Sequence, residues 1–81
     1  MRKKGTVIIM RARIELNTMT DVTEFVSIVT SVPEQVYLSD GKRQQICAKS
    51  QLGAILAKME WDEIYCVCES DISGSIVKFI V

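Results

Sequence analysis

Apolar and polar residues follow one another along this chain with the periods of strands and helices. From Arg11 to Leu16, apolar residues alternate with charged ones, which is the period of a half-buried strand. Thr18 comes next, and Asp21 three residues later approximates a capping box, so a helix is expected to begin beside Thr18 and to end before Pro33. The spacing i, i+3, i+4 and i+7 predicts that this helix packs on a core through Val22, Phe25, Val26 and Val29.

A hairpin and a second helix are predicted in the middle of the chain. Asp40-Gly41 is typical of a tight turn, because glycine adopts positive φ without steric cost, and strand-like residues flank it at 36–38 and 46–48. Ser50 is a preferred helix-capping residue and stands directly before a second helical series. We expect that series to face the core, although Leu52, next to the cap, could be exposed. The series consists of Leu52, Ile55, Leu56 and Met59.

The last part of the chain predicts one more strand and a short helix. Residues 64–68 form an uninterrupted apolar run, which favours a central strand over an edge strand. Asp71 is a candidate cap for a helix whose apolar face would hold Ile72, Ile76, Phe79 and Ile80. The order β-α-β-β-α-β-α, with its hairpin and short connections, favours antiparallel neighbours in an α+β layer. The predicted core contains Phe25, Val26, Val29, Leu52, Ile55, Leu56, Ile64, Cys66 and Ile76.

Charge changes this picture mainly at the start of the chain. Ten basic residues balance ten acidic ones, so the net charge of zero argues against nucleic acid and anionic membranes as partners. The basic residues Arg2, Lys3, Lys4, Arg11 and Arg13 nevertheless all precede the first acid, Glu15. We interpret residues 1–10 as a flexible basic segment or the start of the first strand, and 11–81 as one domain. A basic-armed nucleic-acid binder is an alternative, although no aromatic residues interleave this arm as stacking platforms would.

The cysteines and the lack of histidine restrict metal and redox chemistry. Cys66 and Cys68 are two apart in a strand, so they point to the same face and are poorly placed to form a disulfide. With Cys47 as the third cysteine and no histidine, zinc has no four-ligand set of nitrogen and sulfur donors. We expect reduced, buried cysteines, no metal and no cofactor. No window approaches the ~20 apolar residues of a membrane span, so a cytoplasmic location is expected.

Two blocks of the chain together resemble the phosphocarrier protein HPr family of the bacterial sugar phosphotransferase system. The first block is Leu16-Asn17-Thr18-Met19-Thr20-Asp21-Val22 with Glu24-Phe25-Val26, which is similar to the first HPr helix. The second is the Asp-Gly-Lys turn at 40–42, a short strand, and Ala48-Lys49-Ser50-Gln51-Leu52-Gly53. The blocks occur in family order. The resemblance implies an open-faced sandwich, in which a four-stranded, mainly antiparallel sheet carries its helices on one face.

The main departure from this family is the missing active-site histidine. In the family, a histidine at the start of the first helix accepts a phosphoryl group and passes it on, because imidazole is nucleophilic near neutral pH. Here Asn17 and Thr18 occupy that position, and no arginine follows to hold the phosphate. A threonine hydroxyl without a neighbouring base cannot replace the imidazole. We therefore expect no catalytic residues and no enzyme activity.

Ser50 matches the serine that HPr kinase modifies in some members of the family. A phosphate there would add about −1.5 to −2 charge at a helix N-terminus, which favours anions. Ser50 is therefore a candidate regulatory phosphorylation site, and its simpler role is to cap the helix. By resemblance, the candidate partner-docking residues are Thr18, Lys49, Gln51 and Leu52.

These features predict a regulatory or protein-binding module, related to the phosphotransferase system but unable to carry phosphohistidine. Its expected partners are proteins such as HPr kinase or other phosphotransferase-system components. One alternative is an HPr-fold protein with only a structural or interaction role outside that system. Another is a phosphotransfer component that uses a non-histidine acceptor such as Thr18, Thr20 or a cysteine.

Overall fold

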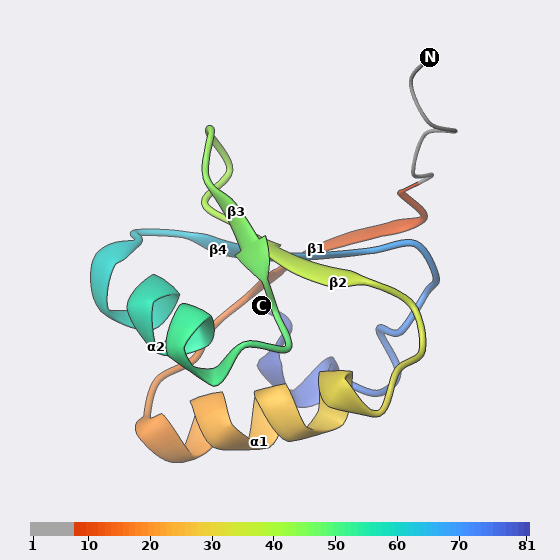
Figure 1. Cartoon of the computed structure of the whole chain (residues 1–81), viewed down its shortest axis with the longest axis horizontal. Helices are drawn as coiled ribbons and strands as arrows, with labels where there is room; N and C mark the ends of the chain where they lie inside the picture. Colours follow the sequence, from red (N-terminus) through yellow and green to blue (C-terminus); the bar gives the residue numbers. More distant parts are fainter. Residues whose placement is uncertain (1–7) are drawn as a thin grey trace.

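The computed structural model describes residues 8–81 and has an α+β architecture (Figure 1). A four-stranded antiparallel sheet has the strand order β1-β4-β2-β3, and both helices lie on one of its faces. The α+β class and the antiparallel four-stranded sheet are therefore confirmed. In chain order the elements are β1 (Met10–Ile14), α1 (Met19–Thr30), β2 (Val36–Ser39), β3 (Gln45–Cys47), α2 (Gln51–Glu60), β4 (Ile64–Cys68) and the 3-10 turn η1 (Val77–Phe79).

Strand β4 lies inside the sheet, as its continuous apolar sequence predicts. It pairs with β1 on one side and with β2 on the other, and Ile64, Cys66 and Cys68 face the core. The last residues of the chain add a short bridge at the outer edge of β1, where Ile14 pairs with Ile80. The expectation about the segment before Met10 concerns Arg2, Lys3 and Lys4, which lie outside the described residues.

Helix α1 packs on the sheet through the predicted stripe. Its side chains Val22, Phe25, Val26 and Val29 are all buried. Thr18 caps the helix by accepting a hydrogen bond from the backbone N–H of Asp21, at 3.1 Å. The Asp21 carboxylate in turn accepts a hydrogen bond from the backbone N–H of Asn17 at 2.9 Å. In the usual capping box this bond comes from the N–H of the N-cap residue itself, so here the donor is the residue before the cap. Ser31 ends the helix two residues before Pro33.

The predicted helix after Asp71 is wrong. The Asp71 carboxylate accepts from both the N–H and the hydroxyl of Ser73, which closes a local turn. Only the single 3-10 turn η1 follows, since Gly74 lowers helix propensity and Ile80 extends to pair with β1. The residues predicted to share the helix face nevertheless contribute to the core: Ile72, Ile76 and Phe79 are buried, and Ile80 is half-buried.

The predicted core face of α2 is also wrong. Its buried residues are Ala54 and Ala57, whereas Leu52, Leu56 and Met59 are exposed and Ile55 is half-buried. The helix lies close to β3: a Cβ on Gly53 would come within 3.2 Å of Ile46 Cδ1. Only small side chains fit at such a close approach, so the large apolar residues occupy the opposite side of the helix.

None of the helices within residues 8–81 has the length and apolar character needed to cross a membrane.

Candidate functional site

The N-terminus of α2 places Ser50 at the molecular surface. Ser50 is exposed and has extended backbone geometry, with φ −89° and ψ 118°. Its hydroxyl oxygen accepts a hydrogen bond from the N–H of Gly53 at 3.0 Å. The predicted cap is therefore confirmed, and the same oxygen is open to solvent at the positive end of the helix dipole.

The residues on either side of Ser50 already have partners within the fold. The Lys49 ammonium donates to the carbonyl oxygen of Val32 at 2.6 Å and ties the start of α2 to the end of α1. The Gln51 amide donates to the hydroxyl of Thr23 at 3.2 Å and links the two helices. Both side chains hold the helical layer together, so Leu52 and Ser50 are the more available groups at this end of α2.

An apolar stripe runs along the outer side of α2. Leu52 is 79% exposed, Leu56 49% and Met59 70%. Their spacing of four and three residues puts them on one face of the helix. We call these three residues the α2 stripe. It begins within one turn of Ser50 and carries no charged side chain of its own.

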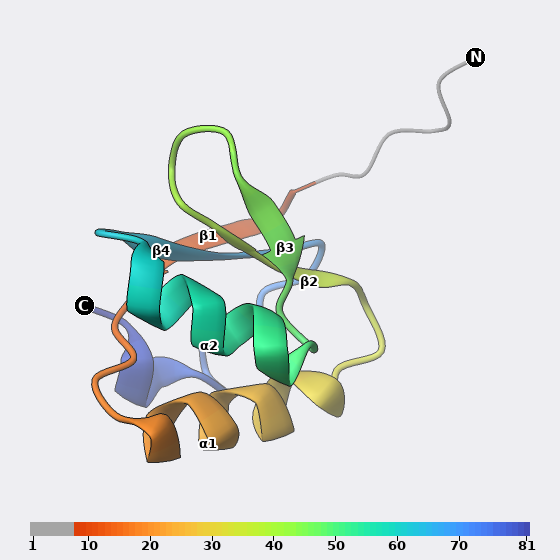
Figure 2. The same cartoon turned by 60° about the vertical axis from the view of Figure 1, so that its left-hand side comes forward.

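The α1 site predicted by resemblance does not join this surface. Figure 2 shows α1 and α2 side by side and running in opposite directions, so their N-termini lie at opposite ends of the helical layer. Thr18 therefore lies away from Ser50, Lys49 and Leu52. The Thr18 hydroxyl accepts a hydrogen bond from the backbone N–H of Asp21. The Asp21 carboxylate accepts a hydrogen bond from the backbone N–H of Asn17. This arrangement makes Thr18 the cap of α1.

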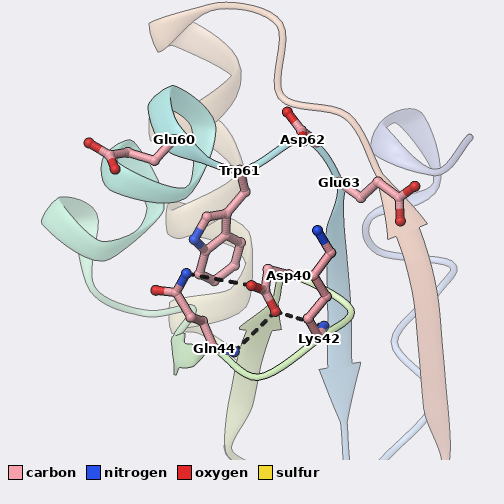
Figure 3. A pocket seen from close by; sticks show the side chains of 7 residues that line it. All are labelled: Asp40, Lys42, Gln44, Glu60, Trp61, Asp62 and Glu63. Carbon is pink, nitrogen blue, oxygen red and sulfur yellow. Dashed lines mark hydrogen bonds between the residues drawn. The ribbon is translucent and has the colours of Figure 1, made fainter.

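A polar pocket that sequence reasoning missed lies between the β2–β3 loop and the end of α2 (Figure 3). It has a volume of about 270 Å³ and is lined by Asp40, Lys42, Gln44, Glu60, Trp61, Asp62 and Glu63. In Figure 3 the side chains of Glu60 and Glu63 point away from Trp61 in different directions, so the carboxylates do not converge. Within residues 8–81, no group of three or more His, Cys, Asp or Glu side chains could hold a metal ion. Trp61 is half-buried and packs against the core, so its side chain covers the core at the end of α2.

Asp40 has a structural part in this pocket. Its Oδ1 accepts from the backbone N–H groups of Lys42 at 2.8 Å and Gln44 at 3.0 Å. Desolvation acts to raise the pKa of the Asp40 carboxyl, but these hydrogen bonds outweigh it and hold the pKa below its usual value. The carboxylate therefore closes the hairpin loop.

The expectation that all three cysteines are buried is wrong for Cys47. Cys66 and Cys68 are buried, whereas Cys47 lies exposed on the short edge strand β3. Burial raises the pKa of the Cys66 thiol to about 12, and the neighbouring Cys68 adds to this effect. All three are free thiols.

Comparisons with protein-family models, curated proteins and solved structures found no match to this chain.

Proposed function

We propose that this protein is an HPr-like protein-binding module that docks through α2, cannot carry phosphohistidine, and is regulated by phosphorylation of Ser50. The observation that carries the proposal is the α2 stripe, which leaves Leu52, Leu56 and Met59 exposed on a helix whose other side is buried. A helix with an apolar face of this spacing binds in an apolar groove of a partner protein. The partner is therefore a protein with such a groove, and the HPr resemblance favours an HPr kinase.

Phosphorylation suits Ser50 because its hydroxyl is exposed and lies at the helix N-terminus. A phosphate there would accept hydrogen bonds from the first N–H groups of α2, so the fold would tolerate the modification. It would also place about −1.5 to −2 charge within one turn of Leu52. Because an apolar groove excludes an unpaired charge, the modification would weaken docking of the stripe.

The test is incubation with HPr kinase and ATP, read by intact mass. We expect one phosphate on the protein and none on Ser50→Ala. Thr18→Ala is the matched control, because Thr18 is also an exposed N-cap hydroxyl with the same type of backbone hydrogen bond. An unmodified protein in a tube where authentic HPr is phosphorylated would reduce Ser50 to a helix cap.

Docking by the α2 stripe is tested in the same reaction. Leu52→Asp is expected to slow the initial rate of Ser50 phosphorylation at least tenfold, with thermal unfolding unchanged because Leu52 is exposed. Val77→Asp is the control, since Val77 is 65% exposed and lies outside α2. Equal rates for the two variants would contradict docking through α2.

A further inference from the structure

The α2 stripe lies on the outside of the molecule in an arrangement that matches a second copy of itself. Figure 2 shows α2 at the front of the described part of the chain, before the sheet and beside α1. Leu56 lies between Leu52 and Met59, which are about 10 Å apart along the helix axis. A two-fold axis at Leu56 would pack Leu52 against Met59 of an antiparallel second copy, and Leu56 against Leu56. Every contact then joins two exposed apolar side chains.

Charge at the edge of the stripe also suits an antiparallel copy. The first turn of α2 contains no acidic residue, so no carboxylate of its own lies at its positive end. Glu60 is exposed in the last turn, two turns after Gly53 and on the same side of the helix. Figure 3 shows its side chain directed away from Trp61. Within residues 8–81 Glu60 forms no ion pair, although Lys42 lines the same pocket and Lys58 shares its helical turn.

We propose that two copies of this chain associate through the α2 stripe as an antiparallel, two-fold dimer, which covers the docking surface in the free protein. In this dimer Glu60 of each copy lies beside Gly53 of the other, at the positive end of that copy's α2. This charge match, made twice by the symmetry, selects a second copy as the occupant. The inference rests on the proposed function of the stripe and adds its regulation.

The size of the interface makes the dimer weak and reversible. A stable complex buries about 800 Å² of surface on each partner. Three exposed side chains on a helix of ten residues cover less than that. The stripe therefore stays accessible to another protein once the chains separate, so self-association competes with docking and does not prevent it.

Phosphorylation of Ser50 would separate the two copies. Its phosphate would lie at the same helix N-terminus that Glu60 of the second copy approaches, and the two anions would repel each other. Ser50→Asp imitates this charge. The dimer is therefore sensitive to the same modification as the docking proposed above.

Sedimentation equilibrium of the full chain, without a kinase, measures the dimer by its mass. We expect the average mass to rise from 9.1 kDa towards twice that value as the concentration increases from about 10 µM to about 1 mM. Leu56→Asp should leave only monomer, because it places a charge on the two-fold axis. Val77→Asp alters an apolar residue that is exposed outside α2 and should leave the dimer intact. A protein that is monomeric throughout this range would overturn the proposal, and thermal unfolding checks each variant's fold.

Introduced cysteines test the antiparallel register. The background is Cys47→Ser, which removes the exposed native thiol, and oxidised glutathione is the oxidant. Leu56→Cys should form a disulfide between two chains, because this position meets itself at the axis. Leu52→Cys should cross-link to Met59→Cys when the two variants are mixed, and poorly to itself. Efficient cross-linking of Leu52→Cys to itself would contradict the antiparallel arrangement.

A double-variant cycle tests the charge contact. Glu60→Gln and Ser50→Asp should each raise the dissociation constant of the dimer about tenfold, since symmetry repeats the contact. Together they should have no greater effect than either alone, because both act on the same contact. Glu69→Gln is the control for Glu60→Gln, since Glu69 follows the other end of β4. Additive effects, or an equal loss in Glu69→Gln, would overturn the placement of Glu60.

The dimer and the proposed docking can fail separately. A protein that remains monomeric but is modified at Ser50 by HPr kinase would reject the dimer alone. A protein that dimerises through Leu56 but is not modified would reject the proposed function and leave the self-association standing.

Discussion

Gly41 lies against the edge of the Tyr65 ring: a Cβ built at Gly41 would be 2.8 Å from Tyr65 Cε1 and 3.3 Å from Cδ1. This contact places the tip of the β2–β3 loop on the central strand β4. Gly41 also has φ +81°, in the left-handed region that side chains other than glycine rarely adopt. Two separate restrictions thus act on the same residue.

Gly41→Ala should therefore destabilise the protein. The left-handed backbone alone costs about 1–2 kcal/mol for an alanine, and displacement of the Tyr65 ring adds to it. Urea unfolding measures the loss. Gly74→Ala is the control, since a Cβ there meets nothing within 4 Å, and it should change stability by less than about 0.5 kcal/mol. Similar losses for the two variants would show that the loop does not rest on Tyr65.

Phe79→Ala should be among the most destabilising single changes. Phe79 is 3% exposed, and its ring meets the buried Phe25 ring edge-on at 5.6 Å between centroids, so it joins the end of the chain to α1. Loss of a buried phenylalanine costs about 3–5 kcal/mol. Urea unfolding of Phe79→Ala, Phe25→Ala and the double variant would measure their coupling. Purely additive losses would contradict a direct interaction between the rings.

The two N-caps should contribute similar stability. Ser50→Ala and Thr18→Ala each remove one side-chain acceptor for a helix N–H, which costs about 1 kcal/mol. Ser50→Asp should stay close to the parent protein, because aspartate also caps helices and its charge suits the helix N-terminus. Thermal unfolding compares the three variants. A Ser50→Asp variant as unstable as Ser50→Ala would argue that α2 does not tolerate an anion there.

Stability should fall in alkaline solution through ionisation of Cys66. Burial raises the pKa of this thiol from 9.0 to about 12, so below pH 9 its contribution is fully present. As pH rises from about 9 towards 12, the unfolded chain loses the proton first and unfolding becomes more favourable. The hydrogen bond to Glu63 raises the pKa of Tyr65 and acts in the same direction. Urea unfolding across this range should show a weaker pH dependence for Cys66→Val than for Cys47→Ala.

Thiol reagents should distinguish the three cysteines in the folded protein. Cys47 is exposed and should react rapidly, whereas Cys66 and Cys68 are buried and should react only after unfolding. Titration with an aromatic disulfide in native buffer and in denaturant counts the reactive thiols. Cys47→Ala should abolish the rapid phase, and a rapid phase that persists in this variant would contradict the burial of β4.

Local patterns in the sequence were sufficient for much of the fold. The stripe of α1, the alternation in β1, the central position of β4 and the caps Thr18 and Ser50 were all predicted correctly. Each of these features depends on residues a few positions apart in the sequence, where hydrophobic periodicity and side-chain hydrogen bonds determine the local structure directly. The order of the elements from β1 to β4 and the antiparallel sheet followed from them, whereas the helix predicted after Asp71 is replaced by the 3-10 turn η1.

The tertiary structure decided which surfaces are covered. Helix α2 has apolar residues on both sides, and the close approach of Gly53 to Ile46 selects the side with Ala54 and Ala57 and leaves the α2 stripe exposed. The basic residues before Glu15 have no aromatic neighbours in the sequence, yet the strand register aligns Arg13 with Tyr65 and brings Tyr37 two strands from Arg11. Neither result is visible in the sequence, because both depend on how segments distant along the chain pack and pair.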